Sequence, residues 1–386
     1  MIQMVDLAGQ YLRLKDEIDA AVQDVFKSAA FINGFAVKTF CERLSTFLDV
    51  PHVIPCANGT DALRIALQAL HIGAGHEVIV PAFTYIAPPE AIASVGATPV
   101  IVDVDPKTFN INADLIEQAI TFSTKAIIAV HLFGQACDME AILKIAEKHK
   151  LSVIEDNAQS LGASYKFSDG QCKKLGTVGT IGITSFFPTK PLACYGDGGA
   201  IFTSDSEQAE HIRLLANHGQ TKKYRHRIIG CNSRLDTVQA AILNVKLKYM
   251  EAFTARRIQL AERYHQALRN CPELLLPETA RNSTHVYHQY TIRVKYGKRN
   301  VLKSFLAEKG IPSMIYYPLP VNEQEAYQGV IRLSGELSEA TRLCNEVLSL
   351  PIHSEMTDEI QTFITETIRQ FFRITNAYTH ACLITN

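Results

Sequence analysis

Two side chains of opposite charge, Lys190 and Asp156, are the strongest candidates for chemistry in this sequence. Lys190 lies in the largely apolar run 184–192, which is followed by the glycine-rich stretch 196–200. A lysine amine becomes a useful nucleophile when desolvation lowers its pKa. The alternative is a solvated surface cation, and Lys190 by itself does not decide between the two.

Asp156 directly follows the apolar run 151–155, which we interpret as a buried strand. A carboxylate in this position lies at the edge where open α/β sheets bind ligands. There it can keep a pyridine nitrogen protonated, which turns an aromatic ring into an electron sink. A helix N-cap is the second interpretation. Asp156 follows one predicted strand and Lys190 follows the next, so both side chains can face one crevice.

A phosphate cradle is expected where the strand ending at residue 56 leads into a helix. Gly59 lets the backbone turn, the first N–H groups of the helix are free, and the Thr60 hydroxyl adds a donor. A helix start capped by Asn58 or Thr60 is equally compatible with the sequence. Ser185 could add a hydroxyl, and Tyr85 could stack on a flat ring or simply pack. Together with Lys190 and Asp156, these groups match the needs of pyridoxal 5'-phosphate.

The elements that position these residues alternate along the chain. Between about residues 50 and 205, short apolar runs alternate with helical patterns such as 61–70. This alternation predicts an α/β fold with a mostly parallel sheet covered by helices on both faces. The glycine-rich turn at 196–199 allows an antiparallel member. The expected strands are 53–56, 77–80, 99–104, 126–131, 151–155, 181–187 and 200–203.

A second region follows. We expect one long helix over 235–268, a strand over 286–295, a helix over 303–309, a strand over 315–317 and a final helix over 359–374. We divide the chain into a large domain, residues 1–250, which includes the N-terminal segment, and a smaller C-terminal α+β domain, residues 251–386.

The composition excludes several functional classes. The 386 residues carry a net charge of -1, which gives no support for nucleic acid as a partner. The basic run 222–227 is either a solvated loop or a site for an acidic ligand. No apolar stretch is long enough to span a membrane, and residues 1–15 do not form a signal peptide. Nine cysteines without a CxxC pair indicate reduced thiols in a cytoplasmic protein and no metal site.

With these motifs in place, the sequence resembles the DegT/StrS family of sugar aminotransferases over nearly its whole length. These enzymes depend on pyridoxal 5'-phosphate and share the aspartate-aminotransferase architecture, PLP fold type I. The resemblance lies in the segments 58–63, 80–85, 155–159, 185–190, 196–200 and 230–236.

The resemblance implies a role for each residue at the ring. Lys190 forms the covalent link to the cofactor, and Asp156 pairs with the ring nitrogen. Gln159 lies near the phenolic oxygen of the ring, and Tyr85 stacks on it. Some relatives replace the lysine by histidine and are dehydratases, so Lys190 favours transamination.

The resemblance also implies how the phosphate is held. Gly59, Thr60 and Ser185 bind it from one chain. Asn232 reaches it from the second chain of a homodimer, so that each active site needs two chains. The amino donor implied is L-glutamate, and the acceptor is the keto group of a nucleotide-linked sugar.

Within the family, the sequence most resembles enzymes that aminate the C3 position. The segment 284–291 and the surroundings of Arg234 are similar to those of UDP-2-acetamido-2-deoxy-3-oxo-glucuronate aminotransferases, which serve cell-surface polysaccharide and lipopolysaccharide synthesis. Arg234 could bind the sugar carboxylate in a bidentate manner. It could equally form an ion pair with Asp236.

Different substrates and functions stay open at this point. Tyr316 and Asn322 occupy sugar-facing positions where many relatives have histidines, and Pro88-Pro89 departs from the usual small or polar residues. A dTDP-3-oxo-6-deoxyhexose is therefore the second candidate substrate. A PLP-dependent dehydratase or lyase and a non-catalytic regulatory relative are further candidate functions.

Overall fold

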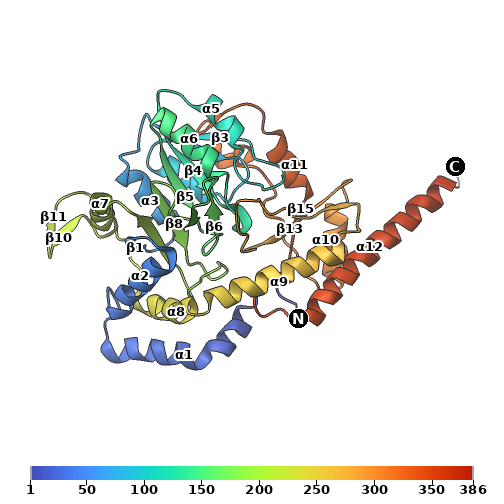
Figure 1. The fold of residues 1–386 in the computed structure, drawn as a ribbon, viewed down its shortest axis with the longest axis horizontal. Helices are drawn as coiled ribbons and strands as arrows, with labels where there is room; N and C mark the ends of the chain where they lie inside the picture. Colours follow the sequence, from blue (N-terminus) through green and yellow to red (C-terminus); the bar gives the residue numbers. More distant parts are fainter. Residues whose placement is uncertain (1, 385–386) are drawn as a thin grey trace.

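The computed structural model describes residues 2–384 and is built around one eight-stranded sheet (Figure 1). The strand order is β1-β9-β8-β5-β4-β2-β3-β14. All neighbours pair in parallel except β9, which is antiparallel to both β1 and β8. The strands are β1 (His52–Cys56), β2 (Glu77–Pro81), β3 (Thr98–Val102), β4 (Thr124–Val130), β5 (Ser152–Asp156), β8 (Ile181–Ser185), β9 (Gly199–Thr203) and β14 (Arg332–Leu333).

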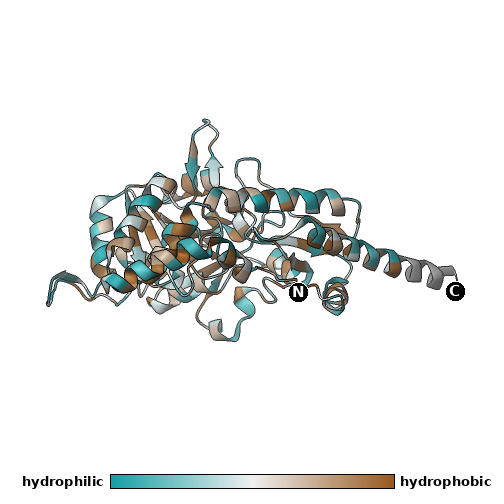
Figure 2. Cartoon of the chain, turned by 90° about the horizontal axis from the view of Figure 1, so that it is seen from below, coloured by the Kyte–Doolittle hydropathy of each residue, from teal (hydrophilic) through white to brown (hydrophobic). Residues whose placement is uncertain are grey.

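The sheet is buried on both faces, because helices cover it from either side (Figure 1). Successive residues of a strand point to opposite faces. In β2, Val78 and Val80 accordingly join the core beneath α3 (Gly59–Ala69), whereas Ile79 joins the core beneath α6 (Met139–His149). The colouring in Figure 2 shows apolar strands inside a mixed exterior. The predicted α/β fold, with a mostly parallel sheet covered by helices on both faces, is confirmed.

The remaining helices pack around this sheet or on the C-terminal region. The longer ones are α1 (Leu7–Ser28), α2 (Phe35–Leu48), α4 (Ala87–Ser94), α7 (Ser206–Ala216), α8 (Thr237–Leu247), α9 (Met250–Leu268), α10 (Arg299–Glu308), α11 (Ser338–Glu346) and α12 (Asp358–Ile384). The short ones are α5 (Ile116–Ala119), η1 (Ala113–Leu115), η2 (Leu132–Gly134), η3 (Val321–Glu323) and η4 (Glu325–Tyr327).

The C-terminal region has its own small antiparallel sheet and core. The sheet has the order β12-β13-β15, and α9, α10 and α12 supply its buried neighbours. Its strands are β12 (Leu274–Leu275), β13 (Tyr290–Val294) and β15 (Val347–Leu350). The chain also returns to the large sheet, since β14 pairs with β3 and Leu343 of α11 lies in the core beneath α3. The division at residue 250 stays a prediction.

Two small β-hairpins lie outside the large sheet. They are β6–β7 (Ser164–Lys166 and Cys172–Lys174) and β10–β11 (Gln220–Lys222 and Arg225–His226). The second carries the basic run 222–227 and lies beyond α7 in Figure 1.

Two sequence predictions in the second region are wrong. The expected single helix over 235–268 is broken at Lys248 and Tyr249 into α8 and α9. The expected strand over 315–317 is not a strand; only Met314 forms a bridge, to Ser349. Prolines at 312, 318 and 320 lack an N–H for a ladder and confine pairing to that one residue.

Three further observations bear on function. Within residues 2–384, no helix is long and apolar enough to cross a bilayer. Among the side chains that the structure describes, those of residues 2–375, no three of His, Cys, Asp or Glu are placed to hold a metal ion. Of the nine cysteines, the eight whose side chains the structure describes, at 41, 56, 137, 172, 194, 231, 271 and 344, are free thiols.

Candidate active site

A cavity of about 850 Å³ opens at the carboxyl ends of the parallel strands. Asp156 ends β5, Ser185 ends β8, and Tyr85 follows β2. Ligands of open α/β sheets bind at this edge. Eight of the ten predicted site residues line the cavity: Gly59, Thr60, Tyr85, Asp156, Gln159, Ser185, Lys190 and Tyr316.

Lys190 and Asp156 line the same cavity, and the charge of each shifts the pKa of the other. Burial lowers the pKa of the Lys190 amine, and the negative charge of Asp156 works in the opposite direction. Burial likewise raises the pKa of Asp156, which the Ala158 N–H, Lys190 and His131 partly offset. Each group is thus desolvated and is stabilised in its charged form by its partner.

Asp156 is not the N-cap of a helix. Its Oδ1 accepts the backbone N–H of Ala158 at 3.0 Å in a turn that follows β5. The second carboxylate oxygen makes no hydrogen bond within residues 2–384, and the side chain lines the cavity. A ligand group can therefore pair with it there.

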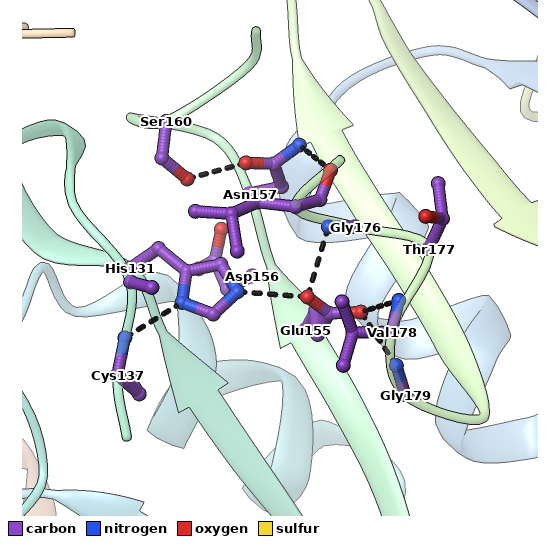
Figure 3. A network of polar contacts seen from close by, with 12 residues as sticks. His131, Cys137, Glu155, Asp156, Asn157, Ser160, Gly176, Thr177, Val178 and Gly179 are labelled. Atoms are coloured by element: carbon purple, nitrogen blue, oxygen red, sulfur yellow. Dashed lines mark hydrogen bonds and ion pairs between the residues drawn. The ribbon is translucent and has the colours of Figure 1, made fainter. Parts of the chain in front are cut away.

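Glu155, the residue before Asp156, anchors the strand from the opposite side (Figure 3). Its Oε1 accepts the N–H groups of Val178 and Gly179 at 2.6 Å each, and its Oε2 accepts that of Gly176 at 2.9 Å. The fourth bond is to His131, whose Nε2 lies 2.9 Å from Oε2.

The proton of His131 is located by its second contact. Its Nδ1 accepts the Cys137 N–H at 3.1 Å, so Nε2 carries the proton and donates to Glu155. Both side chains are completely buried, and the carboxylate receives four hydrogen bonds. This network fixes the end of β5 on which Asp156 sits.

The turn into α3 has the form of a phosphate cradle. Asn58 caps the helix by accepting the Asp61 N–H at 2.8 Å, which leaves the Thr60 hydroxyl free for another role. A Cβ on Gly59 would lie 2.8 Å from the Cβ of Ser185, so only glycine allows this close approach of α3 to β8. The free N–H groups of the first helical turn face the same cavity.

Tyr85 is not a packing residue, since 55% of it is exposed although it lies beside the cavity. Its ring is tilted against that of Tyr317, with 6.3 Å between ring centres. One face is available to a flat ligand.

The cavity also contains residues that the sequence analysis did not single out: Thr84, His288 and Tyr317. Thr84 Oγ1 and His288 Nδ1 are buried and make no hydrogen bond within the described chain. Burial lowers the pKa of His288 well below its usual value, so the ring is neutral. Thr84 could have been found from its place after β2, but His288 comes from a distant segment.

Asn232 and Arg234 do not line the cavity of this chain. Asn232 is exposed and forms an isolated bridge with Asn217. Arg234 donates to Asn217 Oδ1 at 3.4 Å, and this bond takes the place of the suggested pair with Asp236. The single chain therefore does not bring these two residues together with the other predicted site residues, and their roles stay predictions.

The cavity residues fit pyridoxal 5'-phosphate. The unpartnered Thr84 hydroxyl and His288 nitrogen offer hydrogen bonds to a polar ligand. The glycine-narrowed turn at Gly59 offers N–H groups to a phosphate. Lys190 and Asp156 supply the amine and the carboxylate that the cofactor requires.

Comparison with known proteins defines the class. The family model of the DegT/DnrJ/EryC1/StrS aminotransferase family matches residues 12–369, and the chain belongs to this family. The predicted family and enzyme class, a PLP-dependent sugar aminotransferase, are thereby confirmed, as is the predicted cofactor.

Three relatives are particularly similar. The "Pleiotropic regulatory protein" of Geobacillus stearothermophilus is 46% identical over 96% of this chain and 99% of its own length. The UDP-2-acetamido-2-deoxy-3-oxo-D-glucuronate aminotransferase of Pseudomonas aeruginosa is 46% identical over 92% of this chain and 95% of its own. The solved structure of S. venezuelae DesV with a ketimine intermediate is 37% identical, with a TM-score of 0.92 over 96% of this chain and 98% of its own.

The anchor of β5 leads to a stability prediction. Glu155→Gln places an amide among four hydrogen-bond donors and leaves at least one of them unpaired in the core. We expect a loss of roughly 3 kcal/mol in the free energy of unfolding. Denaturant unfolding followed by circular dichroism measures it.

The matched control is Glu117→Gln, which removes an exposed carboxylate that pairs with Lys148 and His149. Its unfolding midpoint should stay at that of the unaltered protein, because exposed pairs contribute little. Equal midpoints for both variants would show that the Glu155 network does not hold β5.

Proposed function

We propose that this enzyme transfers the amino group of L-glutamate to the 3-keto group of a nucleotide-linked sugar, with UDP-2-acetamido-2-deoxy-3-oxo-glucuronate as the first candidate. One observation carries the proposal: a desolvated lysine and a desolvated carboxylate face one cavity at the carboxyl edge of the sheet. The 46% identical aminotransferase of Pseudomonas aeruginosa supports the choice of sugar.

Lys190 is the group that moves the proton. Burial lowers its pKa, so a larger share of the amine is neutral and can act as a base near neutral pH. After it takes a proton from the carbon next to the donor's amino group, the same amine returns a proton as an acid. Its position on the loop after β8 keeps it beside both partners of the exchange.

Asp156 keeps the cofactor ring in its reactive protonation state. When bound, pyridoxal 5'-phosphate supplies the electron sink for the reaction. The cavity-facing oxygen of Asp156 holds a proton at the ring nitrogen, and the Ala158 N–H keeps the carboxylate oriented. Gly59, Thr60 and Ser185 hold the phosphate, and Tyr85 covers the ring.

The proposal includes a homodimer with shared active sites. Asn232 is exposed and close in the chain to Asp236, which bridges Ile32. Around this point lie exposed apolar side chains, among them Phe31, Ile32 and Phe35. Apolar exposure of this kind is typical of a surface that binds another chain. Asn232 would then reach the phosphate held by the partner.

Arg234 is the proposed carboxylate-binding residue of a uronate substrate. Within the described chain its guanidinium makes one long hydrogen bond, at 3.4 Å to Asn217, which leaves its remaining N–H groups able to form a bidentate pair. On this proposal the enzyme serves cell-surface polysaccharide or lipopolysaccharide synthesis, in the cytoplasm where nucleotide-linked sugars are made.

A second candidate substrate is a dTDP-3-oxo-6-deoxyhexose, which has no sugar carboxylate. The charges of the cavity favour it: among the described residues that line it, Lys190 is the one lysine and there is no arginine. Three carboxylates besides Asp156 line it, those of Asp61, Glu90 and Asp197. Tyr316 offers a neutral, partly buried phenol to the sugar.

A PLP-dependent lyase and a non-catalytic regulatory protein are two further candidate functions. The name of the Geobacillus relative, a pleiotropic regulatory protein, supports the regulatory candidate. The intact pair of Lys190 and Asp156 in one cavity argues for a catalytic protein, because ligand binding alone does not require a desolvated amine.

The first test of the proposal is the visible absorption spectrum with and without L-glutamate. The unaltered protein should carry the band of bound pyridoxal 5'-phosphate and lose it when the amino group moves to the cofactor. Lys190→Ala should reduce turnover on the order of 10²–10⁴-fold or more, because the proton carrier is gone.

Lys173→Ala, which alters an exposed lysine on β7, is the control and should behave as the unaltered protein. A protein that binds the cofactor but does not respond to glutamate would point to another donor or to a lyase. Undiminished turnover by Lys190→Ala would rule out the proposed role of this lysine.

The second test separates the two sugars. Arg234→Ala should reduce kcat/KM for the UDP-linked 3-oxo-uronate roughly 10- to 100-fold, the value of a charge-assisted hydrogen bond, and leave a 3-oxo sugar without a carboxylate nearly unaffected. The control is Arg213→Ala on the exposed face of α7. Equal losses on both sugars would remove Arg234 from substrate recognition, and faster turnover of the dTDP sugar would favour the second candidate.

A further inference from the structure

The side-chain amide of Gln159 is held at both of its ends. Its Oε1 accepts the backbone N–H of Phe133 at 2.8 Å, and its Nε2 lies 3.2 Å from the hydroxyl oxygen of Tyr317. Gln159 is 6% exposed and lines the cavity. The two partners come from distant parts of the chain: Phe133 follows β4, and Tyr317 belongs to the C-terminal half.

The direction of each hydrogen bond follows from the donors. A backbone N–H can only donate, so the oxygen of the amide must face Phe133. The amide nitrogen then faces Tyr317 and also can only donate, so the Tyr317 oxygen is the acceptor. A flipped amide would bring two N–H donors together at Phe133. The orientation of Gln159 is therefore unique.

This arrangement leaves one N–H of Gln159 without a protein acceptor. Among the side chains that the structure describes and the backbone of residues 2–375, Nε2 makes the bond to Tyr317 and no second one. Because the side chain lines the cavity, the second N–H is available to a bound ligand.

The ring of Tyr317 is itself fixed. It packs edge-on against Phe83 at 5.8 Å between ring centres and lies 6.0 Å from Tyr316. The following residues are tied to the end of β2, since the Val321 N–H donates to the Ala82 carbonyl at 2.9 Å. Burial raises the pKa of Tyr317, so the hydroxyl stays protonated and its oxygen remains a neutral acceptor.

We propose that Tyr317 is a positioning residue: its hydroxyl oxygen fixes the Gln159 amide so that the remaining N–H points at the cofactor. The inference rests on the proposed function, because it assumes that the cavity holds pyridoxal 5'-phosphate. Through this hydrogen bond, the segment that carries Tyr316, the residue expected to face the sugar, is connected to the cofactor site. On this proposal the phenol acts through its hydrogen bond with Gln159.

The test is Tyr317→Phe, which removes one oxygen and keeps the ring packing. Without its acceptor at Tyr317, the Gln159 amide is held only through its oxygen by the Phe133 N–H, so the amide nitrogen can tilt out of the position that it needs toward the cofactor. We expect the affinity of the apoprotein for pyridoxal 5'-phosphate to fall roughly two- to tenfold, the value of one net hydrogen bond. Fluorescence titration measures the affinity.

A spectroscopic readout accompanies it. The resemblance places Gln159 near the phenolic oxygen of the ring, where a donated N–H stabilises negative charge. The midpoint of the pH-dependent visible absorption of the bound cofactor should therefore rise by about half to one pH unit in Tyr317→Phe. A merely structural role of the hydroxyl would leave this midpoint unchanged.

Two further variants make the test decisive. Tyr264→Phe removes a fully buried hydroxyl that donates to the Pro351 carbonyl at 2.9 Å and does not line the cavity, and it should leave affinity and spectrum unchanged. In a Gln159→Ala background, Tyr317→Phe should have no additional effect on either quantity.

Additive effects of the two substitutions, or a Tyr317→Phe protein with the unaltered affinity and midpoint, would overturn the inference. A change confined to KM for the sugar would overturn it as well, because Tyr317 would then bind substrate. Failure of the proposed function looks different: the unaltered protein would show no visible band with the cofactor.

Discussion

The desolvation of two opposite charges at one sheet edge is the constraint on which this structure depends. Lys190 and Asp156 both lose hydration in the cavity. The Ala158 N–H and then the charge of Lys190 stabilise the carboxylate of Asp156, and the charge of Asp156 stabilises the Lys190 ammonium. Such a pair is useful only if its geometry is fixed. Parallel pairing of β5 with β8, in which Asp156 stands opposite Ile183, brings the two segments together.

The neighbouring carboxylate shows how the direction of Asp156 is secured. Because side chains alternate along a strand, Glu155 points to the face opposite Asp156. There it accepts hydrogen bonds from His131 Nε2 and from three backbone N–H groups of the loop that leads into β8. A slip of one residue would exchange the two carboxylates and bury Asp156 among these donors. The network therefore fixes register as well as position.

The sequence was sufficient to predict those cavity residues that come soon after a strand. Thr60, Tyr85, Asp156 and Lys190 each come soon after an apolar run, and all four line the cavity. It was insufficient where distant segments return to the site, as with His288 and Tyr317. The break between α8 and α9 carries neither proline nor glycine, so periodicity alone predicted one helix. The predicted roles of Asn232 and Arg234 require surfaces beyond one chain.

On the proposed function, the proton-transfer chemistry and the choice of sugar depend on different parts of the molecule. Asp156 at the end of β5 and Lys190 on the loop after β8 line one cavity, whereas Arg234 lies outside the lining of that cavity. The cavity itself holds several carboxylates, which repel an acidic sugar. If the substrate is a uronate, as proposed, a cation from outside the lining would have to offset these charges, and Arg234 is the candidate. The accepted sugar could then change through residues near Arg234 while Lys190 and Asp156 stay as they are.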